Sequence, residues 1–250
     1  MAGNSTIFEE IHCGLPREGP GDSASTRKAF QFMAGLSNAP CILDVGCGPG
    51  MQTLDLADIS KGMITALDLR QRFLDELKER AKKAGVSERV ITVCESMDSM
   101  PFKPGSFDVI WSEGAIYLIG FENGLRLWQP LLKTNGYIAV TELCWLTKEI
   151  PGEIGTFWQK AYPAIANVDD RLKAISACGY RNITHFTLPQ SAWWADYYMP
   201  MEHRLSMLRE KYRNDPPALE GIAKAQEEID RYRVYCGFYG YVFFVMQKLF

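Results

Sequence analysis

The sequence lacks most features of secreted, membrane-spanning and nucleic-acid-binding chains. Its seven cysteines are scattered and never form a Cys-x-x-Cys pair, a pattern that fits neither a disulfide framework nor a zinc site. Lys and Arg number 27 against 30 Asp and Glu, so the net charge of −3 supplies no positive field for nucleic acid or an anionic membrane. The longest strongly apolar stretch, 239–246, is far shorter than the ~20 residues of a membrane helix.

Two further shortages narrow the expected chemistry. Residues 1–10 lack a basic start followed by an apolar run, so we expect no export signal and a location in the reducing cytoplasm. The three histidines, His12, His185 and His203, are too far apart in the sequence to suggest a metal site. We expect a small-molecule partner, no nucleic acid and no membrane, with monomer and homodimer both left open.

The sequence does contain enough apolar residues, 47% of 250, for one α/β unit with an insertion. Between Cys41 and Glu142, short apolar runs alternate with helical patterns, which is typical of a parallel sheet covered on both faces. The turn signal Asn135-Gly136 introduces the last of these runs. The predicted strands are Ile42–Val45, Ile64–Leu67, Val90–Cys94, Phe107–Ser112 and Tyr137–Leu143.

Helical patterns occur before, between and after these strands. One between the second and third strands carries Phe73, Leu77 and Ala81 on a single face and ends before Gly85. Consecutive prolines at 216 and 217 separate two helical patterns in the stretch 189–237. Further helices are predicted at Ser25–Leu36, Phe121–Leu132, Ile154–Tyr162 and Asp169–Cys178, and further strands at Asn182–Leu188 and Tyr239–Lys248.

We therefore predict three parts in one chain. Residues 1–36 form an N-terminal helical segment with a loop that covers a site, and residues 37–188 with 238–250 form the α/β core. Residues 189–237 form a helical cap inserted before the last strand.

The end of the first strand carries the most informative motif. Asp44 stands two positions before a Gly46-x-Gly48-x-Gly50 turn that opens a helix, and glycines there let a ligand approach the backbone closely. The dinucleotide-binding spacing is Gly-x-Gly-x-x-Gly, and here Met51 occupies the position of its third glycine. A phosphate loop is excluded too, because no Lys-Ser or Lys-Thr follows the turn.

These residues resemble the class I S-adenosylmethionine-dependent methyltransferases over roughly residues 20–145. The first family motif matches Asp44 to Gly50, and the acidic residue that ends the second strand matches Asp68, whose carboxylate can accept both hydroxyl groups of a ribose. A third motif appears as Glu95–Met97 before Pro101-Phe102, with Ser96 where the family has a carboxylate, which leaves Asp98 or a backbone carbonyl to hold the adenine. The fourth is Phe107–Glu113. Of these relatives, the chain looks most like small-molecule methyltransferases related to the quinone-biosynthesis type.

The resemblance implies a fold, a reaction and a cofactor site. The fold is a three-layer α/β/α sandwich around a seven-stranded, mostly parallel sheet, with the last strand antiparallel. The reaction transfers the methyl group of S-adenosylmethionine to a small organic acceptor and leaves S-adenosylhomocysteine. The implied cofactor-binding residues are Asp44, Gly46, Cys47, Gly48, Gly50, Asp68, Leu69, Ser96, Met97, Asp98 and Ser112.

The acceptor side is predicted from aromatic residues and from carboxylates at strand ends. Glu113 and Glu142 stand where ligands lie in open α/β sheets and are the candidate general bases. Aromatic side chains offer flat walls with polar edges for a partly apolar acceptor. The candidate acceptor-binding residues are Trp111, Glu113, Tyr117, Trp145, Trp193, Trp194, Tyr197 and Tyr198.

Simpler interpretations stand beside these. Asp44 can serve only to hold the turn, Cys47 only to fill space, and the aromatic residues only to form a core. Asp215-Pro216-Pro217 resembles a nitrogen-methylation motif, but it lies in the cap and Ala218 follows where that motif has an aromatic residue. A non-catalytic protein that binds S-adenosylmethionine or S-adenosylhomocysteine, and a nicotinamide-dinucleotide dehydrogenase, remain the alternative functions.

Overall fold

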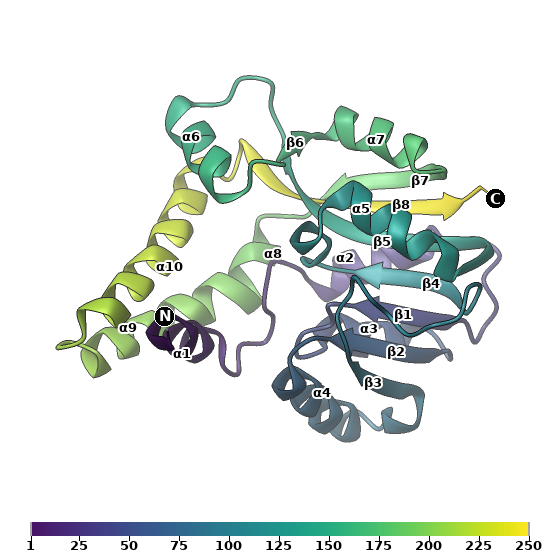
Figure 1. Cartoon of the computed structure of the whole chain (residues 1–250), viewed down its shortest axis with the longest axis horizontal. Helices are drawn as coiled ribbons and strands as arrows, with labels where there is room; N and C mark the ends of the chain where they lie inside the picture. Colours follow the sequence, from purple (N-terminus) through teal and green to yellow (C-terminus); the bar gives the residue numbers. More distant parts are fainter. Residues whose placement is uncertain (1, 250) are drawn as a thin grey trace.

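The computed structural model describes residues 2–249, and describes side chains from Ile7 to Leu249. Its centre is one sheet in the order β3-β2-β1-β4-β5-β8-β7 (Figure 1), with the short β6 paired to β5 outside this path. All pairings are parallel except those of β8, which runs antiparallel to both β5 and β7. The strands are β1 Cys41–Val45, β2 Met63–Asp68, β3 Val90–Cys94, β4 Phe107–Ser112, β5 Leu132–Trp145, β6 Ala166–Asn167, β7 Tyr180–Thr187 and β8 Tyr239–Lys248.

This sheet confirms the predicted fold class, and it differs from the prediction mainly in β5. That strand is longer than expected, because the Asn135-Gly136 turn signal lies inside it and not before it. Asn135 has a positive φ of 61°, and the pairing of β4 with β5 shifts register between Phe107 and Val109. The signal therefore marks an irregularity within a strand, where a residue in the left-handed region bends the backbone.

Helices cover both faces of the sheet because successive strand residues point to opposite sides. Ile42 of β1 belongs to a core with α2 and α3, whereas Leu43 belongs to a second core with α5 and α7. The helices that flank the sheet are α2 Ser23–Gln31, α3 Met51–Ile59, α4 Gln71–Lys83, α5 Phe121–Trp128 and α7 Val168–Ala177. Helix α6, Gly152–Ala161, lies beside α10, Pro216–Tyr235 (Figure 1), and contacts it through Glu153 and Arg231. Short 3-10 turns occupy Ser87–Arg89, Ile116–Leu118 and Gln129–Leu131.

Two predicted helices end earlier than the apolar pattern suggested. The helix expected over Phe121–Leu132 ends at Trp128, because Pro130 lies in a 3-10 turn that leads directly into β5. The helix expected over Ser25–Leu36 is α2, Ser23–Gln31, with Asp22 as its N-cap.

The stretch 189–237 contains α8 Ser191–Trp193, a π-helical turn Trp194–Tyr198, α9 Met199–Lys211 and α10 Pro216–Tyr235. Helix α1, Ala2–His12, lies against α9 and α10 (Figure 1), and Ile7 packs where Gly221 of α10 leaves room. Buried residues of this stretch, such as Trp193 and Tyr232, belong to the same core as Trp111 of β4. The stretch therefore extends the hydrophobic core of the sheet.

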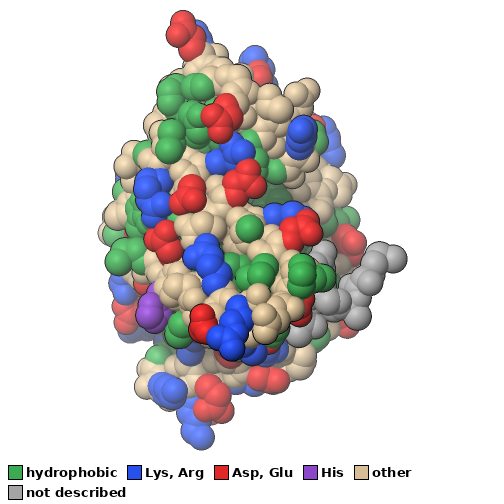
Figure 2. Space-filling view, turned by 90° about the vertical axis from the view of Figure 1, so that its left-hand side faces the viewer, with side chains coloured by type: hydrophobic (Ala, Val, Ile, Leu, Met, Phe, Trp, Pro, Cys, Tyr) green, Lys and Arg blue, Asp and Glu red, His purple; other side chains and the backbone are tan. Residues whose placement is uncertain are grey.

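The outer face of α9 and α10 carries charges of both signs, interspersed across the surface in Figure 2. Arg233 pairs there with Glu202 and Asp230, and Arg231 pairs with Glu227. Among residues 2–249, no helix has the length and hydropathy that a membrane crossing requires.

Candidate active site

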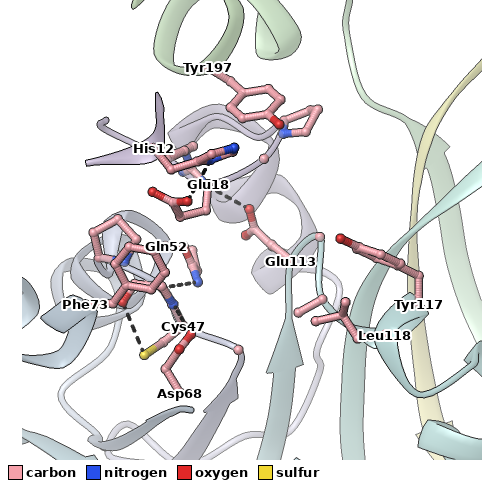
Figure 3. A pocket seen from close by; sticks show the side chains of 18 of the residues that line it. His12, Glu18, Cys47, Gln52, Asp68, Phe73, Glu113, Tyr117, Leu118 and Tyr197 are labelled. Atoms are coloured by element: carbon pink, nitrogen blue, oxygen red, sulfur yellow. Dashed lines mark hydrogen bonds and ion pairs between the residues drawn. The ribbon is translucent and has the colours of Figure 1, made fainter. Parts of the chain in front are cut away.

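A cavity of about 800 Å³ lies at the carboxyl ends of β1, β2 and β4, between the sheet and the helices of 189–237. One end is formed by the glycine turn after β1 and by Asp68, the last residue of β2. The other end is formed by aromatic side chains, among them Tyr117 and Tyr197 (Figure 3). Such a position, outside the carboxyl ends of parallel strands, is where ligands bind in open α/β sheets.

The glycine turn is held by backbone contacts to β2. The amides of Gly46 and Cys47 both donate to the carbonyl of Leu67, at 2.8 and 3.0 Å, and the amide of Gly48 donates to Asp68 Oδ2 at 2.9 Å. The other carboxylate oxygen of Asp68 accepts from the amide of Arg70 at 2.9 Å. The turn and the carboxylate predicted to bind the cofactor are therefore fixed to each other at the cavity wall.

The three glycines of the motif have different roles. A Cβ on Gly46 would lie 2.4 Å from Cβ of Ala115, and one on Gly50 would lie 2.2 Å from Cδ1 of Leu77 in α4. A Cβ on Gly48 would meet only Glu18, whose Cγ would be 3.5 Å away. Gly46 and Gly48 line the cavity, whereas Gly50 does not, and its conformation serves the packing of the turn against α4.

Asp44 lies beneath the turn and outside the cavity lining. Its side chain is fully buried and accepts hydrogen bonds from Thr53 Oγ1 at 2.6 Å and from Gln52 Nε2 at 3.4 Å. Burial raises the pKa of Asp44 to about 7, an effect that the Thr53 and Gln52 hydrogen bonds oppose. This geometry agrees with the simpler interpretation, in which Asp44 holds the turn through Thr53 and Gln52.

The other predicted cofactor residues divide between the cavity wall and the interior. Leu69, Ser96 and Met97 line the cavity with Cys47, whose pKa is raised by burial, so its thiol stays protonated. Asp98 is exposed and outside the lining. Ser112 is buried and donates to the carbonyl of Val45 at 2.9 Å, so the structure does not bring its side chain to the cavity.

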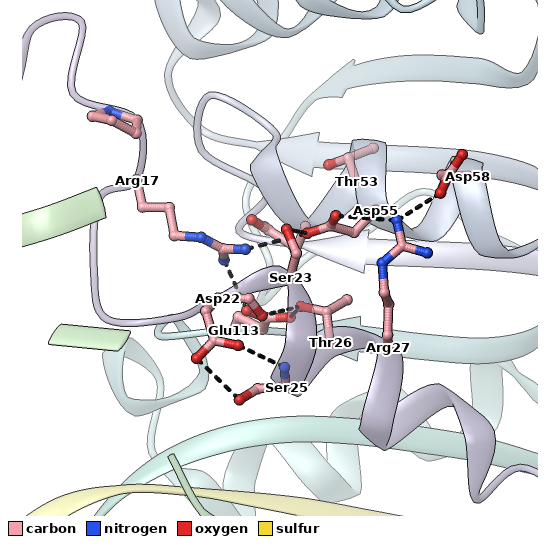
Figure 4. Close-up of polar contacts among 12 residues, drawn as sticks. Arg17, Asp22, Ser23, Ser25, Thr26, Arg27, Thr53, Asp55, Asp58 and Glu113 are labelled. Carbon is pink, nitrogen blue, oxygen red and sulfur yellow. Dashed lines mark hydrogen bonds and ion pairs between the residues drawn. The ribbon is translucent and has the colours of Figure 1, made fainter. Parts of the chain in front are cut away.

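Glu113 lines the cavity, but both of its oxygens are occupied (Figure 4). Oε1 accepts from Thr26 Oγ1 at 2.7 Å and from Trp111 Nε1 at 2.9 Å, and Oε2 accepts from Arg17 Nη1 at 3.0 Å. Arg17 is buried and also contacts Asp55 at 3.4 Å. A carboxylate held by three donors is a poor general base, and Glu113 instead fastens the N-terminal segment to β4.

Glu142, the second candidate base, does not line the cavity. Its Oε1 accepts from Tyr162 Oη at 2.6 Å and from Arg171 Nη2 at 3.0 Å, and its side chain is fully buried. Burial raises the pKa of Glu142 to about 7, while Arg171 and Tyr162 oppose the rise. Of its two partners, Tyr162 lines the cavity and Arg171 does not.

The predicted aromatic residues also divide. Tyr117, Trp193 and Tyr197 line the cavity. Trp111 is fully buried with its ring 5.3 Å from that of Phe243, and Tyr198 is buried behind the wall. Trp145 and Trp194 lie against Tyr239 and Arg233 respectively, outside the cavity, because the core needs these large apolar surfaces.

Sequence reasoning missed a second set of wall residues, which come from distant parts of the chain. The loop after α1 contributes Arg17 and Glu18, and Glu18 Oε2 lies 2.9 Å from Nδ1 of His12. No motif marks these positions. Glu228 had a readable signal, because it stands on the apolar stripe of α10 formed by Ile222, Ala225, Ile229 and Tyr232. The other missed residues on the wall include Phe8, His12, Trp158, Tyr162, Glu228 and Tyr241.

Within residues 2–249, no three side chains of His, Cys, Asp or Glu gather as metal ligands would. His12 lines the cavity, and the ring of His185 in β7 stacks on Phe244.

The chain is similar in sequence to known methyltransferases. A family model described as a methyltransferase domain matches residues 42–136. A 27-O-demethylrifamycin SV methyltransferase of Amycolatopsis mediterranei is 31% identical over 93 residues, which cover 36% of this chain and 34% of that protein. A sarcosine/dimethylglycine N-methyltransferase of Halorhodospira halochloris is 26% identical over 140 residues, which cover 54% of this chain and 50% of that protein. The chain thus spans half or less of the length of these two relatives.

Similarity over nearly the whole chain is found in solved structures. A S-adenosylmethionine-dependent methyltransferase from Geobacter sulfurreducens, in complex with S-adenosyl-L-homocysteine, matches with a TM-score of 0.83 and 19% identity. The match covers 96% of this chain and 97% of that chain. At this identity the match shows a shared fold, including the helices of 189–237.

Proposed function

We propose, from the premise that this chain belongs to the class I S-adenosylmethionine-dependent methyltransferases, that it methylates a small organic molecule held in the cavity. The resemblance predicted from the sequence motifs is confirmed by the family match and by the shared fold. The acceptor, the assignment of individual site residues and the division into core, cap and covering loop belong to this proposal.

The observation that carries the proposal is the joint position of Gly48 and Asp68 on the cavity wall. Gly48 has a φ of 52°, and among the residues whose side chains are described only Glu18 lies within 4 Å of where its Cβ would stand, so a ligand can approach the backbone there. Asp68 presents a carboxylate beside the turn, suited to accept two hydroxyl hydrogens of a ribose. The residues present therefore fit S-adenosylmethionine as cofactor, with Leu69, Ser96 and Met97 on the same wall.

When bound, S-adenosylmethionine supplies a methyl group that its sulfonium already activates. The remaining work of the chain is to align the acceptor and to exclude water. The loop 13–22 serves the second task, because Arg17 is fixed to Glu113 and the amide of Gly21 donates to the carbonyl of Ala192 at 3.0 Å. Aromatic residues at the far end of the cavity align the acceptor.

Calorimetry with S-adenosylhomocysteine tests the cofactor site. We expect binding by the wild-type chain, and a loss of about 1.5–3 kcal/mol in Asp68→Ala, the range for hydrogen bonds to a charged group. Asp75→Ala is the matched control, because Asp75 is exposed on α4 and contacts Gln71 and Lys78. Binding of NAD in place of S-adenosylhomocysteine would favour the dehydrogenase alternative, and unchanged affinity in Asp68→Ala would place the ribose elsewhere.

Methyl transfer to a panel of small acceptors then separates an enzyme from a protein that only binds the cofactor. The enzyme forms S-adenosylhomocysteine in an acceptor-dependent way, which mass spectrometry measures. Binding without turnover on any acceptor would support the non-catalytic alternative.

A further inference from the structure

The end of the cavity far from the glycine turn is apolar and rich in aromatic side chains. Trp193 stacks on Tyr232 with ring centroids 4.1 Å apart, and its ring centroid lies 5.4 Å from that of Tyr241. Ring faces carry partial negative charge and attract cations, most strongly where water is excluded. The aromatic residues on the wall here are Tyr117, Trp158, Tyr162, Trp193, Tyr197 and Tyr241.

One carboxylate stands among these rings. Glu228 of α10 is half-buried on the cavity wall, and its Oε1 accepts from Tyr198 Oη at 2.9 Å. After burial, its charge is the next cause that raises the pKa of Tyr117 and Tyr197, which line the same cavity. Burial raises the pKa of Glu228, an effect that the Tyr198 hydrogen bond and the charge of His12 oppose. Glu228 forms no ion pair with a residue whose side chain the structure describes.

The other carboxylates on the wall are already occupied or lie elsewhere. Asp68 lies at the glycine-turn end, where it is assigned to the cofactor ribose, and Glu113 accepts from Arg17, Thr26 and Trp111. Glu18 lies over Gly48 at the glycine-turn end, with Oε2 facing His12 and Oε1 without a partner among the described residues, and Glu95 is exposed after β3 at the same end. Glu228 is therefore the carboxylate that remains for a ligand at the aromatic end.

Among the described residues that line the cavity, His12 is the basic side chain at the aromatic end; its Nδ1 lies 2.9 Å from Glu18 Oε2, and its charge also acts on Glu228 without forming an ion pair with it. Arg17 is buried between Glu113 and Asp55. Arg70 follows Asp68 at the glycine-turn end, with its guanidinium over the rings of Phe8 and Phe73. A phosphate or carboxylate group at the aromatic end would meet the carboxylate of Glu228 and the ring faces, with the indole N–H groups of Trp158 and Trp193, unpartnered among the described residues, as donors. The charge of Arg70 reaches this end only as a minor cause that lowers the pKa of Tyr117.

We propose that the acceptor is a small organic amine, which enters as its ammonium form and is held by Glu228 within the ring of aromatic side chains. This inference rests on the proposed function and names the substrate class of the same site. It selects against acceptors that carry a phosphate or carboxylate at the reacting end.

The chemistry of transfer to such an amine balances within the cavity. Glu228 accepts one proton from the ammonium nitrogen, which frees a lone pair on nitrogen. That lone pair forms the new nitrogen–carbon bond as the carbon–sulfur bond breaks, and the electron pair of the broken bond stays on sulfur. The product is a methylated ammonium, and the proton on Glu228 later leaves to solvent.

Calorimetry on the chain saturated with S-adenosylhomocysteine tests this proposal with three probes of matched shape. The probes are 2-phenylethylamine, 2-phenylethanol and phenylacetate, which carry a positive, no and a negative charge. We expect the amine to bind about tenfold more tightly than the alcohol, because a desolvated cation gains from both the rings and the carboxylate. Phenylacetate should show no measurable binding.

Two substitutions in α10 test whether Glu228 causes the preference for the amine. Glu228→Gln should reduce the preference for the amine to within about threefold. Glu227→Gln is the matched control, because Glu227 is the next residue, exposed and paired with Arg231. Affinity for S-adenosylhomocysteine should be unchanged in both variants, which also reports that they fold.

The outcomes separate the two proposals. Equal affinity of the wild-type chain for amine and alcohol, a preference for phenylacetate, no binding of the amine, or a preference that survives Glu228→Gln would each overturn the amine assignment. The comparison of amine and alcohol binding by the wild-type chain tests the amine assignment even if a variant fails to fold. Absence of S-adenosylhomocysteine binding by the wild-type chain would instead overturn the proposed function.

Discussion

The two ends of the cavity are built in opposite ways. At the glycine-turn end, the polar groups are satisfied by neighbours within one βαβ unit: Gly48 pairs with Asp68, and Asp44 pairs with Thr53. At the aromatic end, the wall comes from segments far apart in the chain, and Glu228 has one oxygen held by Tyr198 and no charged partner among the described residues.

This difference separates cofactor binding from acceptor selection. The polar groups of the glycine turn already have hydrogen-bond partners, so the turn is preorganised and binding of the cofactor costs little conformational entropy there. A carboxylate without a cation is costly until a ligand supplies one, so the aromatic end discriminates among acceptors by charge.

The largest expected effect compares two glycines of the same turn. Gly50→Ala should lower the free energy of unfolding by roughly 2–6 kcal/mol, because the new Cβ overlaps Leu77 and φ is 86°. Gly48→Ala has a positive φ but no comparable overlap, so its cost should stay near about 1–3 kcal/mol while S-adenosylhomocysteine binding weakens. Urea unfolding measures the first quantity and calorimetry the second. Equal destabilisation by the two substitutions would contradict the separate roles that we assign to Gly48 and Gly50.

A second expected effect concerns the pH dependence of stability at the glycine-turn end. The pKa of Asp44 is about 7 in the folded chain, above the value of about 3.9 expected when unfolded, so the folded chain binds more protons between these values. The contribution of Asp44 to the free energy of unfolding is therefore fully present below about pH 4 and is lost as the pH rises to about 7.

The size of this loss is tested by comparison with Asp44→Asn. Between pH 4 and 7 the wild-type chain should lose up to about 4 kcal/mol relative to the variant. Other groups, including Glu142, titrate in both chains and cancel in the difference. Parallel stability curves for the two chains would show that Asp44 is ionised in the fold.

The smallest expected effect compares the Thr53–Asp44 hydrogen bond at the glycine-turn end with the Tyr198–Glu228 hydrogen bond at the aromatic end. Thr53→Val leaves the fully buried Asp44 without its closest donor and should lower the free energy of unfolding by about 1–3 kcal/mol. Tyr198→Phe removes the donor to Glu228, which still faces the cavity, and should cost about 0.5–1.5 kcal/mol. Chemical denaturation of both variants measures the difference. A larger cost for Tyr198→Phe would mean that Glu228 is as sealed as Asp44.

Sequence reasoning recovered the strands because their patterns are local. The run Tyr239–Lys248 was predicted with the bounds that the structure shows, and the strand Val90–Cys94 likewise. It placed the break between α9 and α10 correctly at Asp215-Pro216, where Asp215 caps α10. It extended α5 too far, because an apolar pattern continues through Pro130 although the helix does not.

The candidate bases show where sequence reasoning stopped. Glu113 and Glu142 stand at strand ends, as a ligand-binding carboxylate would, but Arg17 and Arg171 occupy them. Both arginines are distant in sequence from their partners, so no spacing reveals the pairing. Glu228 was overlooked although its place on the apolar stripe of α10 marks it in the sequence.

The sequence by itself determined the order of strands and helices, the glycine turn and the carboxylate beside it, since all depend on neighbours within one βαβ unit. Only the tertiary structure decided which aromatic residues form the cavity wall and which fill the core, and which carboxylates keep a free oxygen. Those outcomes depend on contacts between residues that are far apart in the sequence: Arg17 and Glu113 are 96 positions apart, and Trp193 packs against Tyr232 of α10 and Tyr241 of β8. The physical reason is that burial and charge pairing are properties of the packed chain, and local sequence fixes neither.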